Sequence, residues 1–164
     1  MAPYLLTNQL TMKHFLFALL CTTGMSVTGW QTNFETAKKL AKEQDKLILL
    51  NFSGSDWCGP CIRMHREFFS NDQFTRMADS ALIMLNADFP RDKKHQLSKE
   101  QKAHNEALAD QYNPSGKFPF TLLLDAEGKV IRSWDGFPSM SPAGFSMEIK
   151  HLYESRNKQK NDPL

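Results

Sequence analysis

Two cysteines separated by two residues are the side chains with the clearest chemistry in this sequence. Cys58 and Cys61 follow an apolar run typical of a buried strand and stand at the start of a helical pattern. A helix amino terminus carries unpaired amides and about half a positive charge, which favours a thiolate over a thiol. Only the thiolate attacks a disulfide. We therefore predict Cys58, at the exposed end of that helix, as the nucleophile and Cys61 as the residue that resolves the mixed disulfide.

The neighbours of the two cysteines fit the same chemistry. Gly59 permits a close approach, and Pro60 fixes the backbone φ angle while lacking an amide that the first helical turn would leave unpaired. Trp57 directly precedes the nucleophile, so we expect it at the surface with a functional role rather than in the core.

A zinc site is the alternative use of such a pair, because two cysteines can be half of a Cys2His2 set. His65 with either His95 or His104 would have to complete it. The sequence has no second pair of this kind, and Gly-Pro between the cysteines favours redox chemistry. We therefore expect neither a bound metal nor a cofactor.

Secondary-structure elements that would hold the cysteines in place follow from apolar periodicity and turn residues. A capping box at Thr32 and Glu35 opens a first helix. A second helix begins at the cysteines and runs through Phe69. The other predicted elements are strands at 47–52 and 81–87, a polar helix over 92–111, a hairpin of 120–124 and 130–133, and a last helix that opens at Ser141-Pro142.

The composition limits what the protein can be. Its 164 residues suit one ordinary domain, and a net charge of +2 gives no support for nucleic-acid binding. Three cysteines are too few for a disulfide-stapled miniature fold. The charged run at 92–102 is typical of a solvated face, with partner recognition as the alternative.

The amino terminus has the pattern of a secretory signal peptide. Lys13 precedes a short apolar run and then small residues, and Met12 is a possible start. We predict a signal peptide over 1–29, a domain over 30–154 and a flexible polar tail over 155–164. Lipidation at Cys21 is disfavoured, because large residues precede it where a small one is usual.

Trp57-Cys58-Gly59-Pro60-Cys61 after a strand resembles the active-site sequence of thioredoxins, and the element order over residues 33–153 is similar to theirs. The resemblance implies an α/β thioredoxin fold, in which a central mixed sheet is flanked by helices. It also implies a cis proline before the hairpin at Pro119, with the backbone of Phe118 pairing with the substrate. The run from Ser53 to Trp57 and the run from Ala87 to Pro90 are similar to those of exported bacterial Dsb-type proteins, including the chlamydial H-type.

One departure from the thioredoxin pattern concerns proton transfer. Thioredoxins usually carry a buried Asp in the central strand, where this chain has Asn51, which cannot take a proton. Asp56, expected to be exposed to solvent, is the nearest candidate for a partial electrostatic substitute. Proton transfer to and from Cys61 would then be slower or pass through water.

The resemblance implies an exported, monomeric thiol–disulfide oxidoreductase whose substrates are protein disulfides. A reductase is favoured, because Gly-Pro between the cysteines resembles reducing thioredoxins. An isomerase or an oxidase is the alternative, and a non-catalytic docking module is the rival from another class. A reductase has to be reduced again, so the partner expected besides the substrates is a membrane electron donor of the Dsb type.

Overall fold

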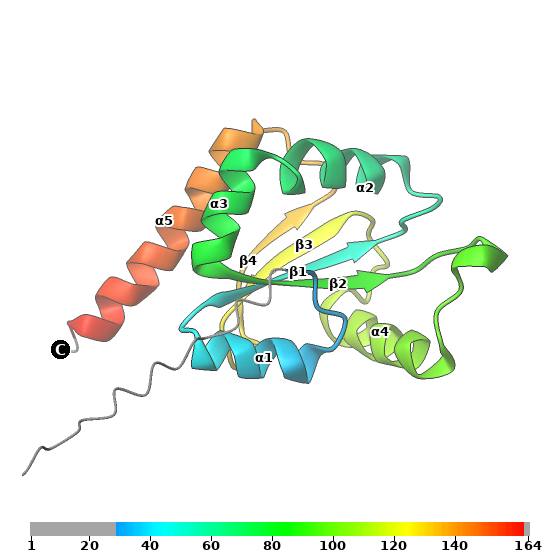
Figure 1. Ribbon diagram of the computed structural model, residues 1–164, viewed down its shortest axis with the longest axis horizontal. Coiled ribbons are helices and arrows are strands. Elements are labelled where there is room, and N and C mark those ends of the chain that lie inside the picture. Colours follow the sequence, from blue (N-terminus) through cyan, green and yellow to red (C-terminus); the bar gives the residue numbers. More distant parts are fainter. Residues whose placement is uncertain (1–28, 163–164) are drawn as a thin grey trace, which may run out of the picture.

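The computed structural model describes residues 29–162, so most of the predicted signal peptide and Cys21 lie outside the described residues. Within that range, no helix has the length and apolar character needed to cross a membrane. The elements, in chain order, are α1 (Phe34–Glu43), β1 (Leu47–Ser53), α2 (Gly59–Met64), the π-helical turn η1 (His65–Phe69), α3 (Asp72–Ala81), β2 (Leu82–Asp88), the 3₁₀ turn η2 (Lys93–His95), α4 (Lys99–Tyr112), β3 (Phe120–Leu124), β4 (Val130–Asp135) and α5 (Pro142–Asn161) (Figure 1).

The four strands form one mixed sheet in the order β2-β1-β3-β4. β1 pairs with β2 in parallel and with β3 antiparallel, and β3 and β4 form the predicted hairpin. Gly128 turns this hairpin with a φ of 92°. The mixed sheet expected from the sequence is confirmed, and β1 lies at its centre with a paired neighbour on each side.

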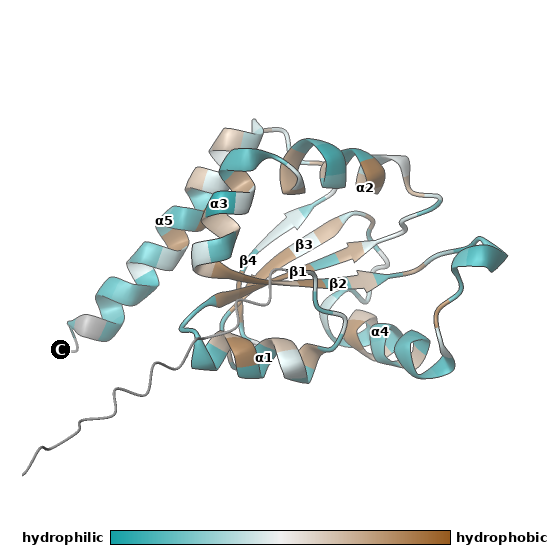
Figure 2. Ribbon diagram, viewed as in Figure 1, coloured by the Kyte–Doolittle hydropathy of each residue, from teal (hydrophilic) through white to brown (hydrophobic). Residues whose placement is uncertain are grey.

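Helices cover both faces of the sheet, and the central strands β1 and β3 are mostly apolar and buried, whereas the edge strand β4 is mostly exposed (Figures 1 and 2). Successive side chains of a strand point to opposite faces. In β1, Leu47 and Leu49 pack toward α2, α3 and α5, whereas Ile48, Leu50 and Phe52 pack toward α1 and α4. The same alternation places Asn51 and Ser53 on the side of α2, which is the side of the cysteines.

The first helix begins one residue later than the capping box predicted. Asn33, not Thr32, is the N-cap, and its Oδ1 accepts the Thr36 N–H at 2.9 Å. The Thr32 carbonyl instead accepts a hydrogen bond from Gln101 Nε2 at 2.8 Å. Glu35 pairs with Lys38 at 2.8 Å rather than with the amide of residue 32. An Asn one residue closer to the helix is therefore the better cap.

Residues 72–81 form α3, an element that the sequence analysis did not predict. Asn71 caps it by accepting the N–H groups of Gln73 and Phe74. Phe74, Met77 and Ala81 are buried on its inner face. These apolar positions are spaced as in a helix, but the segment is short and lies directly between another helix and a strand, so its periodicity is hard to separate from theirs.

The polar helix predicted over 92–111 is two separate elements. Asp92 caps the turn η2 through the Lys94 N–H at 2.9 Å. Gln96 is extended, and Ser98 then caps α4 through the Gln101 N–H at 3.2 Å. Two capping side chains six residues apart thus interrupt the helix, and the extended residues between them form a loop beside the sheet edge.

The last helix continues to Asn161, beyond residue 154, where the sequence analysis placed the end of the domain. Its N-terminus is as predicted, since Ser141 caps it and Pro142 stands in the first turn. Near its C-terminus, Arg156 donates to the Asp45 carbonyl at 2.7 Å and to its carboxylate at 2.8 Å. This contact holds the polar end of α5 against the turn between α1 and β1.

Candidate active site

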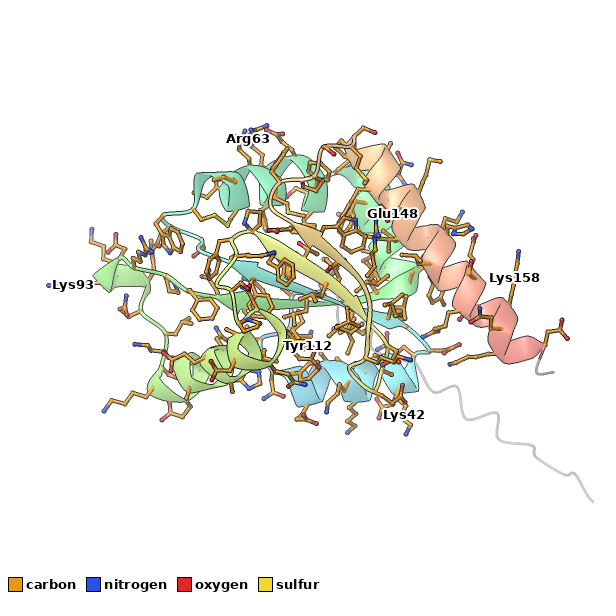
Figure 3. All side chains as sticks on the ribbon, turned by 180° about the vertical axis from the view of Figure 1, so that it is seen from behind. Lys42, Arg63, Lys93, Tyr112, Glu148 and Lys158 are labelled. Atoms are coloured by element: carbon orange, nitrogen blue, oxygen red, sulfur yellow. A yellow bond between two sulfur atoms is a disulfide. The ribbon has the colours of Figure 1, made fainter. Side chains whose placement is uncertain are left out.

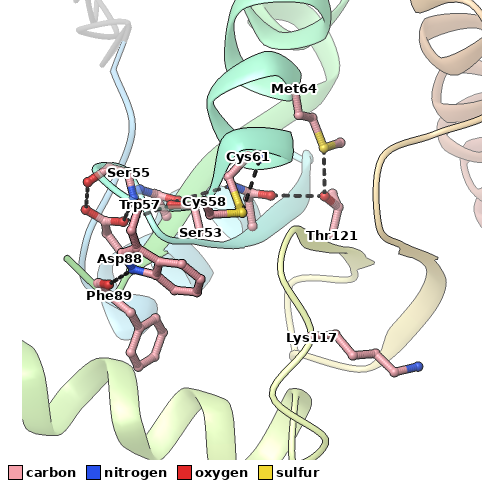
Figure 4. Close-up of a disulfide and its surroundings, with 12 residues drawn as sticks. Ser53, Ser55, Trp57, Cys58, Cys61, Met64, Asp88, Phe89, Lys117 and Thr121 are labelled. Atoms are coloured by element: carbon pink, nitrogen blue, oxygen red, sulfur yellow. Dashed lines mark hydrogen bonds between the residues drawn. A yellow bond between two sulfur atoms is a disulfide. The ribbon is translucent and has the colours of Figure 1, made fainter. Parts of the chain in front are cut away.

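Cys58 and Cys61 are joined by a disulfide at the amino terminus of α2, with their Cα atoms 5.2 Å apart (Figure 4). Cys58 is the N-cap, and its Sγ accepts the Cys61 N–H at 3.3 Å. α2 continues directly into η1, so one helical run reaches from residue 59 to residue 69. The Cys58 sulfur therefore lies where unpaired amides and the helix dipole favour a thiolate.

The exposure predicted for Cys58 is absent. Both cysteines are 5% exposed, so exposure does not distinguish the two sulfurs in this oxidised state. The reason is that the Cys58 sulfur is bonded to Cys61 and turned onto its amide. The two sulfurs differ in position rather than in accessibility. Cys58 caps the helix terminus, and Cys61 lies within the first turn.

Trp57 is half-buried beside the disulfide and fixed at both ends of its indole. Its Nε1 donates to the Phe89 carbonyl at 2.7 Å, and its ring meets the Phe118 ring at a centroid distance of 5.4 Å. The Arg91 guanidinium lies 3.7 Å from the centroid of the indole, as in a cation–π contact. The loop after β2 thus clamps the residue that precedes the cysteines.

Gly54 is a glycine that the packing of Trp57 requires. A Cβ at Gly54 would overlap the Trp57 indole, whereas a Cβ at Gly59 would meet no atom within 4 Å. The close approach predicted at Gly59 concerns the neighbouring cysteines and a bound target, and it stays a prediction. Pro60 stands in the first helical turn as predicted, and both Gly59 and Pro60 are exposed.

Asp56 binds the loop that follows β2 and does not face the cysteines. Its carboxylate accepts the N–H groups of Arg91 at 2.9 Å and Asp92 at 2.8 Å and lies 3.4 Å from His95 Nδ1. These hydrogen bonds lower the pKa of Asp56 from its ordinary value of 3.8, and the bond from the Arg91 amide has the largest effect. Its side chain is only 10% exposed, so the solvent exposure predicted for Asp56 is wrong. Asp56 therefore anchors the loop.

The Phe118-Pro119 peptide bond is cis, as the sequence analysis expected. The Pro119 carbonyl accepts the Gly136 N–H at 2.9 Å, which ties this turn to the end of β4. Among residues 29–162, the backbone N–H and carbonyl of Phe118 make no hydrogen bond. Phe118 therefore offers a free donor and acceptor next to Trp57.

Asn51 is 6% exposed on the central strand, on the side of α2. Its Oδ1 accepts the Thr121 hydroxyl at 3.0 Å, and its Nδ2 donates to Asn86 Oδ1 at 3.3 Å. Ser53 continues this polar row by donating to Asn86 at 3.1 Å and to Asp88 at 3.1 Å. The neutral amide noted in the sequence thus stands at the place where thioredoxins usually carry an acid, and the carboxylate in this polar row is that of Asp88.

A cleft of about 510 Å³ opens beside Cys61, with Asn51, Ser53 and Asn86 among its lining residues. His65 lies at its rim, one turn after Cys61. The other two histidines considered for a zinc site are bound elsewhere: His95 contacts Asp56, and His104 Nε2 accepts the Phe34 N–H at 3.1 Å. No group of three potential metal ligands gathers anywhere in the described chain.

Known proteins resemble this chain over most of its length, including the site described above. A family model described as thioredoxin-like matches residues 29–126, which include both cysteines and Pro119. The disulfide bond reductase DsbH of Chlamydia pneumoniae is 35% identical over 127 residues, which cover 77% of this chain and 74% of that protein. The thioredoxin-related protein DsbJ of the same organism is 24% identical over 127 residues, which cover 77% of this chain and 35% of DsbJ.

Solved structures show the same likeness. A DsbH oxidoreductase superposes with a TM-score of 0.68 at 32% identity, over 77% of this chain and 84% of that chain. A thioredoxin from Thermus thermophilus superposes with a TM-score of 0.57 over 79% of this chain and 90% of that chain, and at 14% identity this likeness concerns the fold alone.

Gly54→Ala is expected to lower the free energy of unfolding by about 1–3 kcal/mol, because the added methyl group overlaps the Trp57 indole. Gly59→Ala is the matched control, since its methyl group meets nothing within 4 Å and replaces a glycine at the first position of a helix. We expect it to leave that free energy unchanged or to raise it. Urea unfolding of the oxidised proteins measures both, and equal losses would contradict the role assigned to Gly54.

Asp56→Asn is expected to destabilise the protein at neutral pH and to lose this effect in acid. The folded protein holds the pKa of Asp56 below 3.8, so the carboxylate contributes its full stability above that pH. The contribution falls as the pH drops through the lowered pKa, where the wild-type side chain takes up a proton. Urea midpoints of both proteins between pH 2 and pH 7 measure the difference, and a gap independent of pH would contradict this account.

Proposed function

Because the chain belongs to the thioredoxin-like family and has a Dsb-type thiol–disulfide redox role, we propose that it is an exported reductase of disulfides in other proteins. The observation that carries the proposal is the Cys58–Cys61 pair at the amino terminus of α2. Its periplasmic or otherwise exported location rests on the signal-peptide pattern before residue 30.

Catalysis begins with the reduced pair. The Cys58 thiolate attacks one sulfur of the target disulfide, the target S–S bond breaks, and one target thiolate leaves. The Cys61 thiol then loses its proton, and its thiolate attacks the Cys58 sulfur of the mixed disulfide. The second target thiolate leaves, and the enzyme retains the disulfide of the present structure. Two electrons have passed from the pair to the target.

The proton of Cys61 leaves through water in this proposal. Asn51 cannot accept it, and the 510 Å³ cleft gives water access to the side of the helix that carries Cys61. A thiol facing polar groups and water can lose its proton to solvent without a dedicated acid or base nearby. We therefore expect the rate of the second step to follow one ionisation, that of the Cys61 thiol. Beside a buried carboxylate it would follow two coupled ionisations.

Phe118 and Pro119 are the residues proposed to hold the target. The unpaired backbone donor and acceptor of Phe118 suit the addition of an extended segment, as at any open strand edge. Trp57 stands beside Phe118 at a ring distance of 5.4 Å, so the two would enclose the target next to the nucleophile. Gly59 and Pro60, which are exposed, would complete this surface.

The direction of the reaction is proposed from the Gly-Pro dipeptide and from the relative named a disulfide bond reductase. A reductase leaves each cycle oxidised and has to receive two electrons from outside. A membrane electron donor of the Dsb type is the partner proposed for that step, and the enzyme is proposed to act as a monomer. Isomerase or oxidase activity is the alternative direction for the same pair.

The cysteine variants test the proposal directly. Cys58→Ser is expected to reduce turnover of a protein disulfide to the rate of the supplied dithiol alone, because no nucleophile remains. Cys61→Ser is expected to lose turnover and to accumulate a mixed disulfide with the target, because Cys58 still attacks and nothing resolves the product. Turnover by absorbance and adduct mass by mass spectrometry measure these outcomes.

Cys21→Ser is the matched control for the loss of a cysteine, and it should turn over as the wild type does. If Cys58→Ser kept wild-type turnover, the protein would act through some other surface. A docking module with idle cysteines would then replace the reductase.

A further inference from the structure

We propose that a second cleft beside the disulfide selects targets that carry an apolar side chain and a nearby acidic residue next to the cysteine to be reduced. We call it the Trp57–Phe118 cleft and define it by Trp57, Phe89, Pro90, Arg91, Lys102 and Phe118. Its volume is about 400 Å³. The inference rests on the proposed function and names the target sequence that this function would prefer.

Three aromatic rings form the apolar part of the cleft. Phe118 meets Trp57 at 5.4 Å and Phe89 at 5.5 Å between ring centroids, both near edge-to-face. All three side chains are half-buried, in contrast to core rings such as Phe52 and Phe68, and Phe89 and Phe118 pack with one side against the core. Partly exposed aromatic rings that touch one another beside a reactive group suit an apolar side chain of a bound partner.

The cleft is held in shape before any target arrives. Trp57 Nε1 bonds the Phe89 carbonyl, and Asp56 accepts the Arg91 and Asp92 amides. On the opposite side, Asn105 Nδ2 donates to the Asp88 carbonyl at 2.8 Å and ties α4 to the end of β2. A preformed cleft loses little conformational entropy on binding, so its shape can contribute to selection.

Positive charge gathers around this cleft. The segment 91–102 has five basic residues and two acidic ones, and the turn that it forms projects from the sheet edge, with Lys93 at its tip (Figures 1 and 3). Lys102 is at the cleft with 67% of its side chain exposed, and its nearest carboxylate, Glu106, is 3.9 Å away. Arg91 lies on the Trp57 ring. An acidic group of the target would therefore meet two cations.

Asp88 is the acidic residue of the cleft lining, and its carboxylate is already engaged. Ser53 donates to its Oδ1 at 3.1 Å, the Ser55 N–H donates to the same oxygen at 2.9 Å, and the Ser55 hydroxyl donates to its Oδ2 (Figure 4). These three bonds direct the carboxylate toward the loop before Trp57. The carboxylate keeps its negative charge, but its oxygens already accept bonds from the chain itself.

The cleft lies within reach of a target bound at Phe118, which is itself part of the lining. An extended segment rises about 3.3 Å per residue and points alternate side chains to the same side. A residue within about two positions of the target cysteine would thus place its side chain over the cleft. The preferred target is a disulfide flanked by an apolar residue, best an aromatic one, and by Asp or Glu.

Disulfide-linked peptides that differ only beside one cysteine test this selection on the full-length protein. The flanking pairs are Phe-Asp, Phe-Lys and Gly-Asp, and the measured quantity is kcat/KM for reduction with a dithiol as electron source. We expect the Phe-Asp peptide to be reduced at least about threefold more efficiently than either of the others, the size that exposed charge pairs allow. Added salt near 1 M should reduce the Asp-over-Lys preference, because it screens exposed charges.

Charge reversal at the cleft gives the matched comparison. Lys102→Glu is expected to lower the Asp-over-Lys ratio at least about threefold, and Arg91→Glu should act in the same direction. Lys39→Glu carries the same charge change on α1, and its side chain is 75% exposed, so it should leave the ratio as in the wild type. The ratio is internal to each variant and is insensitive to a general loss of activity.

Two results would overturn the inference in distinguishable ways. Reduction of all three peptides with equal efficiency, or a ratio that Lys102→Glu and Lys39→Glu change equally, would remove the cleft as a selector and leave the proposed function intact. Failure to reduce any peptide or protein disulfide would overturn the proposed function itself, and this inference with it.

Discussion

Burial of β1 on both faces is the constraint on which the rest of this structure depends. The strand lies between β2 and β3 and under helices on either side, so its apolar residues have no face left for solvent. The chain can reach the surface again only where the strand ends, at Ser53. A parallel neighbour, β2, ends at the same edge, and the loops that follow these two strands therefore meet there. The loop after β1 leads into the cysteine pair, and the loop after β2 contains the segment that contacts Trp57.

The contact between the two loops turns this meeting point into a site. Trp57 donates to the carbonyl that follows β2, and Asp56 accepts two amides from the same segment. The reactive pair is thus held from the side by residues about 32–36 positions away in the chain. None of these contacts involves either sulfur, so they do not depend on the bond between the two cysteines.

Local patterns predicted much of the fold and of the site. The strands, the helix that begins at the cysteines, the cap at Ser141 and the cis bond at Pro119 all follow from short runs of sequence or from the resemblance that they carry. The errors have local causes of their own. Asn33 competes with Thr32 for one cap, and Asp92 and Ser98 each start a new element inside a pattern that looked like one helix.

Two of the residues that sequence reasoning missed, Phe89 and Arg91, act through a contact distant in the chain, whereas Gly54 acts on a residue only three positions away. Phe89 and Arg91 contribute through Trp57, and the need for glycine at residue 54 exists only because the indole folds back onto it. The run of charges after Pro90 indicates the loop but does not reveal which of its residues contact Trp57. The register between β1 and β2 determines which residues of the two loops meet, because it pairs Ser53 with Asp88 and so starts both loops at the same edge of the sheet.

The reduction potential of the Cys58–Cys61 pair tests the central claim most directly. Equilibrating the protein with glutathione or dithiothreitol buffers, with Cys21 replaced by Ser so that only this pair titrates, gives the value from the fraction oxidised. A reductase predicts a potential near that of thioredoxin, about −270 mV, where each 30 mV is tenfold in the equilibrium constant. A potential near the −120 mV of the oxidant DsbA, or a pair that shows no reversible couple, would contradict it.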